Sequence, residues 1–120
     1  MDICIFVAAP GHVMSLFDIR DIVKAATGWE TSLYELMEAG ERGIVMARMF
    51  NIREGFSSKD DVIPKRFNEE LQNGFASHSK IDLAELKKAV YYYYELMNWD
   101  SKTGIPRKGK LLSLGLEWLT

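Results

Sequence analysis

The chain has 120 residues, of which 48% are hydrophobic and 27% charged, a composition typical of one globular domain with a packed core. Its 15 lysines and arginines against 17 acidic residues give a net charge of -2, which argues against general binding to nucleic acid or to a membrane surface. The longest apolar run, residues 3–10, is far shorter than the roughly 20 residues that span a bilayer, and no basic segment of a signal peptide precedes it. We therefore expect a soluble, cytoplasmic protein.

The chain opens with an apolar segment, residues 1–14, which the Pro10-Gly11 pair interrupts near its end. In isolation this pattern suits a buried strand or an extended arm. It also fits the cut edge of a longer chain. We accordingly expect two parts, the apolar segment 1–14 and a helical domain over 15–120.

Three helices are expected to begin at capping boxes, in which a capping side chain is followed three residues later by an acidic one. The pairs are Ser15 with Asp18, Ser32 with Glu35, and Asp82 with Glu85. Apolar residues then recur at helical spacing, which predicts helices over 16–27, from 33 to Gly55, and from 83 to about Asn98.

Two shorter helices are expected in the remaining sequence. Residues 55–80 are polar and contain breakers, which predicts a long ordered loop with one short helix around 65–71. Pro106 can open a last helix over 107–113. Five helical elements with no strand pattern after residue 14 predict an all-α domain.

The sequence offers no self-contained catalytic motif, so no catalytic residue is predicted. Its single cysteine, Cys4, cannot form an internal disulfide, and together with His12 and His78 it does not complete a tetrahedral metal site. From composition alone, we expect Cys4 to be a buried or terminal thiol. The tyrosine run at 91–94 is better explained by packing than by a ligand platform.

Charged residues are dense in the helix that starts at 33. They are Glu41, Arg42, Arg48, Arg53 and Glu54. Several lie next to the apolar stripe, where an arginine is usually paired with a carboxylate or a carbonyl. A structural ion-pair network is our interpretation, with a functional cluster as the alternative.

Four motifs occur in order between residues 40 and 67. They are Glu41-Arg42, the run Phe50–Phe56 (F-N-I-R-E-G-F), Asp60-Asp61, and Pro64 with Arg66. This stretch resembles the C-terminal region of the tungsten-containing aldehyde ferredoxin oxidoreductases. The similarity continues through Thr27–Trp29, Tyr93–Leu96, Trp99-Asp100, Gly104–Pro106 and Leu114–Leu116. Asn98 departs from it, since the family often has glycine there.

The resemblance gives Cys4 a role that composition does not. In the family, a D-x-x-G-L-C segment contacts the pterin cofactor and supplies the last of four cysteines that hold a 4Fe-4S cluster. The matching residues here are Ile3, Cys4 and Ile5, without the leading aspartate and glycine. The resemblance implies that Cys4 is the metal ligand and that the backbone of Ile3 and Ile5 lies beside the pterin.

The implied function is that of a C-terminal helical domain of an aldehyde ferredoxin oxidoreductase, which oxidises aldehydes to carboxylic acids and passes electrons to ferredoxin. The tungstopterin, the other cluster ligands and the cofactor domains would belong to the remainder of the parent enzyme. The isolated chain is expected to be inactive and to hold no cofactor. The alternative is a standalone helical interaction protein that kept the fold and lost the redox role. Aldehyde preference, tungsten versus molybdenum, and oligomeric state are not predicted.

Overall fold

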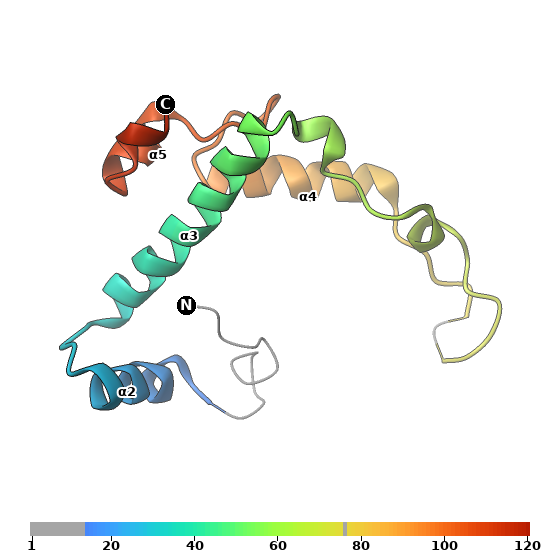
Figure 1. The fold of residues 1–120 in the computed structure, drawn as a ribbon. Helices are drawn as coiled ribbons and strands as arrows, with labels where there is room; N and C mark the ends of the chain where they lie inside the picture. Colours follow the sequence, from blue (N-terminus) through green and yellow to red (C-terminus); the bar gives the residue numbers. More distant parts are fainter. Residues whose placement is uncertain (1–13, 76) are drawn as a thin grey trace. The chain divides into compact units, whose positions relative to one another are not determined.

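The structure, a computed structural model, describes residues 14–75 and 77–120, and these ranges are mainly helical, with turns and irregular loops between the helices (Figure 1). The α-helices are α2 (Leu16–Thr27), α3 (Leu33–Arg53), α4 (Leu83–Leu96) and α5 (Lys108–Ser113), and the 3-10 helices are η1 (Ser58–Asp60), η2 (Lys65–Asn68) and η3 (Glu117–Leu119). Apart from an isolated bridge between Trp99 and Pro106, the described residues form no β structure. The predicted all-α fold is confirmed.

The helix starts follow the predicted capping boxes. At Ser15, the backbone N–H donates to Asp18 Oδ2 at 2.8 Å while Asp18 N–H donates to Ser15 Oγ at 3.2 Å. The same reciprocal pair joins Ser32 and Glu35, at 2.7 and 3.2 Å. Asp82 caps α4 with its own side chain, which accepts from the N–H groups of Ala84 and Glu85, but the return bond to Glu85 that would complete the predicted box is not among the hydrogen bonds of the described residues. Each cap satisfies backbone donors that have no partner within the first helical turn.

The long loop contains less α-helix than its sequence suggested. The short helix expected around 65–71 is the 3-10 helix η2, because Glu69 turns to extended backbone at φ -97° and ψ 142° and stops it after one turn. A second 3-10 helix, η1, follows Ser57, which forms a capping box with Asp60 that the sequence reading missed.

The chain divides into two compact units at residue 46, within α3. In the first unit, the buried apolar side chains are Ile19 on α2 and Leu36 and Val45 on α3. The predicted boundary at residue 14 lies at the edge of the described residues and stays a prediction.

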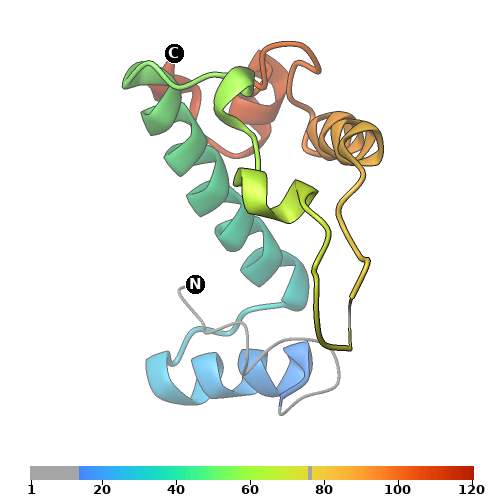
Figure 2. The same cartoon turned by 90° about the vertical axis from the view of Figure 1, so that its right-hand side faces the viewer.

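The second unit, residues 47–120, has its core where the segment after α4 meets the C-terminal turns. Its buried apolar side chains are Tyr94, Trp99, Leu111, Leu114 and Leu116. Helix α5 packs against η3, and both follow α4 at the red end of the ribbon in Figures 1 and 2. No helix of the described ranges is long and apolar enough to cross a membrane.

Candidate functional site

The second unit is organised around Arg48, a buried arginine on the last turns of α3 whose side chain is only 9% exposed. Its guanidinium donates from Nη1 and Nη2 to the two carboxylate oxygens of Asp61, at 2.8 and 2.7 Å. Its Nε donates to the Gly104 carbonyl at 2.9 Å. This fork geometry is specific to arginine, because lysine presents a single point charge. Arg48 therefore ties α3 to two distant segments.

Two aromatic side chains complete the Arg48 cluster, which comprises Arg48, Asp61, Tyr94, Trp99 and Gly104. The Tyr94 hydroxyl, from α4, donates a hydrogen bond to Asp61 Oδ2. The Arg48 guanidinium lies 5.3 Å from the Trp99 ring centre and 5.8 Å from that of Tyr94. Cation–π attraction at such distances adds to the ion pair.

The turn from 98 to 106 presents Gly104 to Arg48. Asp100 Oδ1 accepts from the N–H groups of Lys102 and Thr103, at 3.1 and 2.8 Å, and so closes the turn. Gly104 itself has φ +69°, and an added Cβ would overlap the Arg48 guanidinium and come within 2.9 Å of the Tyr94 ring. Only glycine fits here, for reasons of both backbone and space.

Protonation in the cluster follows from burial and from the hydrogen bonds. Burial raises the pKa of Tyr94 to about 12, assisted by the hydrogen bond and the negative charge of Asp61. Burial alone would also raise the pKa of Asp61, but hydrogen bonds from Arg48 and Tyr94 outweigh it and hold that pKa below its usual value. At neutral pH the cluster thus contains an ionised pair and a neutral phenol.

This arrangement suits structural anchoring better than acid-base chemistry. The carboxylate and the guanidinium are held against each other, and the phenol keeps its proton far above neutral pH, whereas a general acid or base works best with a pKa near the operating pH. The predicted structural network is correct for Arg48, but its partner is Asp61 of the loop. The guanidinium of Arg53 instead lies over the Phe50 ring, 5.8 Å from the ring centre.

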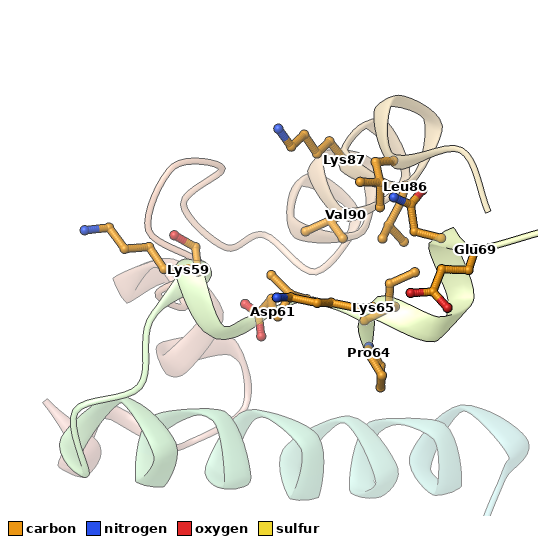
Figure 3. Close-up of a pocket in the computed structure, with 13 residues that line it drawn as sticks. Lys59, Asp61, Pro64, Lys65, Glu69, Leu86, Lys87 and Val90 are labelled. Atoms are coloured by element: carbon orange, nitrogen blue, oxygen red, sulfur yellow. The ribbon is translucent and has the colours of Figure 1, made fainter. Parts of the chain in front are cut away.

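Beside the Arg48 cluster lies a cavity of about 680 Å³ between the 58–69 segment and α4, which we call the α4 cavity (Figure 3). Its lining side chains are Ser58, Lys59, Asp61, Val62, Ile63, Pro64, Lys65, Asn68, Glu69, Leu83, Leu86, Lys87 and Val90. Apolar side chains from both walls meet there, and sequence analysis assigned the cavity no role. The apolar residues at helical spacing on α4 were the only feature of the sequence that pointed to it.

Comparison with known proteins identifies the family. The family model described as aldehyde ferredoxin oxidoreductase, domains 2 and 3, matches residues 1–116. The chain belongs to the aldehyde ferredoxin oxidoreductase family. Among curated relatives, the tungsten-containing aldehyde ferredoxin oxidoreductase of Thermococcus kodakarensis is 37% identical over 101 residues, and that of Pyrococcus furiosus is 36% identical over 101 residues. In both cases the match covers 82% of this chain and 16% of the relative.

A solved structure of related fold supports the assignment to the oxidoreductase family. The active-site complex BamBC of benzoyl coenzyme A reductase, in complex with 1,5-dienoyl-CoA, aligns with a TM-score of 0.70 and 29% sequence identity. The alignment covers 91% of this chain and 15% of that one. The chain thus spans about one-sixth of the length of the oxidoreductases that it resembles.

The residues predicted to approach the cofactors, Ile3, Cys4 and Ile5, lie outside the described residues. Their proposed roles therefore remain predictions. Across residues 14–75 and 77–120, no three histidine, cysteine, aspartate or glutamate side chains are grouped so that they could hold a metal ion.

Proposed function

We propose that this chain is the C-terminal helical domain of a tungsten-dependent oxidoreductase that converts aldehydes to carboxylic acids and delivers the electrons to ferredoxin. The observation that carries the proposal is the family match over residues 1–116, which includes Cys4. Because the chain spans only 16% of its curated relatives, we assign the complete activity to the longer protein and none to the isolated chain.

Cys4 is proposed as one ligand of a 4Fe-4S cluster in that protein. Thiolate sulfur is the usual ligand of iron in such clusters, and four cysteines are commonly required. A chain with a single cysteine can supply one of them, so the other three would come from the remainder of the oxidoreductase. The donor set of the chain fits this shared arrangement.

Ile3 and Ile5 flank Cys4 and are proposed to place their backbone beside the pterin. The tungstopterin would supply the redox chemistry, as cofactors do in enzymes of this kind. The chain would contribute shape and anchoring. In the second unit, the Arg48 cluster links α3, the loop and α4 through charge-assisted hydrogen bonds, which suits a rigid wall next to a buried cofactor.

The coding DNA upstream of Met1 provides a first test. An open frame that continues upstream and encodes a C-x-x-C-x-x-x-C segment would supply the three missing ligands. A stop codon followed by an independent promoter would overturn the proposal and favour the standalone helical interaction protein.

A second test measures iron in the full-length parent oxidoreductase with Cys4→Ala. We expect the variant to lose the iron and the reduced-cluster electron paramagnetic resonance signal, because alanine has no donor atom. His78→Asn is the matched control: it removes the exposed imidazole of the loop, and asparagine tolerates the positive φ of 64° at this position. Full iron content in the Cys4→Ala variant would contradict the role of Cys4.

A further inference from the structure

The α4 cavity has two apolar walls that the described residues do not fill. One wall is the segment around Val62, Ile63 and Pro64, and the other is the side of α4 that carries Leu86 and Val90. Figure 3 shows Leu86 and Val90 facing the segment that contains Pro64. The cavity volume of about 680 Å³ would accommodate several side chains of an incoming segment.

Exposure of these walls is high for apolar residues. Val62 is 72% exposed and Leu83 is 43% exposed. Ile63, Leu86 and Val90 are half-exposed. Apolar side chains left open to water around one cavity are a mark of an interaction site, since apolar surface gains about 25 cal/mol for each Å² that is buried.

The charges around the cavity indicate what covers it. Lys59, Lys65 and Lys87 line it, and none of the three makes an ion pair with a carboxylate of residues 14–75 and 77–120. Asp61 is already engaged by Arg48, so Glu69 is the remaining acidic group of the lining. The cavity is therefore apolar inside and net positive at its rim.

We propose that the α4 cavity is the docking site for an apolar segment with carboxylate side chains from the remainder of the parent oxidoreductase. This inference rests on the proposed function, because the segment is taken to come from the portion of the protein outside this chain. The curated relatives are about six times as long as the matched region, so most of their residues lie outside it. Apolar side chains of the segment would fill the cavity, and its carboxylates would pair with the lysines.

Burial of the cavity can be measured in the full-length parent by thiol labelling of Val62→Cys. The side chain of Val62 is 72% exposed among the described residues, so protection in the parent must come from a segment other than those that form the cavity walls, and the cross-linking described below identifies that segment. We expect labelling at least about tenfold slower in the folded parent than in the same protein unfolded in urea, read by mass spectrometry of the peptide. Labelling at the rate of the unfolded protein would overturn the proposal.

The matched control is Ala84→Cys, an exposed position on α4 that does not line the cavity. It should be labelled rapidly in the folded parent. Equal protection at both positions would contradict a site confined to the cavity. Protection of Val62→Cys that disappears on dilution would show that a second molecule covers the cavity, and protection that appears only when a free fatty acid is added would show a small-molecule site. Either result would also overturn the proposal.

The proposed pairing of the cavity lysines with carboxylates of the docked segment can be tested by cross-linking. Treating the full-length parent with a carbodiimide joins a lysine and a carboxylate that already touch. We expect cross-linked peptides between Lys65 or Lys87 and an aspartate or glutamate outside residues 1–120. Cross-links confined to carboxylates of this chain would overturn the proposed partner.

Neither readout depends on iron or on aldehyde oxidation. If Cys4→Ala keeps its cluster while Val62→Cys remains protected, the ligand role fails and the docking site stands. If Val62→Cys is labelled freely while Cys4→Ala loses its iron, the docking site fails and the ligand role stands.

Discussion

Arg48 and Asp61, separated by 13 residues, share two parallel hydrogen bonds of 2.8 and 2.7 Å. The pair connects the end of α3 to the loop that follows it, in a setting where the Arg48 side chain is 9% exposed and that of Asp61 30%. Partial burial makes the pair sensitive to the loss of either partner, because the remaining charge or carbonyl cannot be fully solvated.

Replacing Arg48 with methionine should strongly destabilise the second unit. Methionine preserves much of the apolar stem but leaves the Asp61 carboxylate and the Gly104 carbonyl without their main donor. We expect the free energy of unfolding to fall by about 3 kcal/mol, the low end for a broken buried pair because Asp61 retains some solvent. Urea titration followed by circular dichroism measures the change.

The control for this substitution is Arg53→Met, which removes an exposed arginine from the end of the same helix. Its effect should stay within about 0.5 kcal/mol. Similar losses for the two variants would contradict the assignment of Arg48 as the anchor of the unit.

Gly104→Ala should be destabilising although it adds only one methyl group. The new Cβ would overlap the Arg48 guanidinium, and φ +69° is unfavourable for alanine. We expect a loss of at least about 2 kcal/mol, combining backbone strain with displacement of Arg48. Gly109→Ala in α5 is the matched variant: its Cβ meets nothing within 4 Å, so helix propensity should raise stability by up to about 1 kcal/mol. Thermal melts of the two proteins should therefore move in opposite directions.

Alkaline pH should remove the contribution that the Tyr94 hydroxyl makes to the free energy of unfolding. The phenol of an unfolded chain ionises near pH 10, whereas burial raises the pKa of Tyr94 to about 12 in the folded protein. The stabilisation is thus fully present below about pH 10 and is lost as the pH rises through about 12. Tyr94→Phe should cost about 2 kcal/mol at pH 7, and its difference from the unchanged protein should narrow from pH 10 to 12 in urea titrations. A constant difference would show that the hydroxyl is not held by Asp61.

Acid should destabilise the Arg48 cluster by protonating Asp61. Its folded pKa lies below the usual value, so the stability it contributes is present above about pH 4 and is lost as the pH falls through the folded pKa. Asp61→Asn should be less stable than the unchanged protein at pH 6, and the difference should shrink below pH 4. Urea titrations at pH 6, 4, 3 and 2.5 measure it. A difference that persists unchanged to pH 2.5 would mean that the charge of Asp61 contributes nothing.

Local signals were sufficient to predict where the three long α-helices begin. Capping boxes and helical periodicity placed the beginnings of α2, α3 and α4, since both depend on residues within a few positions of each other. The 3-10 helices of the loop were harder to predict, because the extended backbone at Glu69 that ends η2 has no local sequence signature.

The Arg48 cluster could be predicted only in part. The sequence indicated that Arg48 is paired, but not that Asp61, Tyr94 and Gly104 converge on it, because their contacts span 13 to 56 residues. The family motifs contained Asp61 and Gly104 without revealing that both bind Arg48. The α4 cavity likewise arises from two segments whose proximity is a tertiary effect, so the apolar residues at helical spacing on α4 could not show that a cavity lies beside them.

Asn98 stands at a position where the family resemblance predicts glycine. Asn98 follows α4 with φ +54°, a left-handed conformation that asparagine tolerates and glycine adopts without strain. Its carbonyl accepts a hydrogen bond from the Arg107 N–H at 3.2 Å, so the backbone position must be kept. Asn98→Gly should be neutral or change stability by less than about 0.5 kcal/mol, whereas Asn98→Val should cost about 1–2 kcal/mol because a β-branched side chain clashes at positive φ. Equal thermal melting temperatures for the two variants would show that this turn does not require the left-handed conformation.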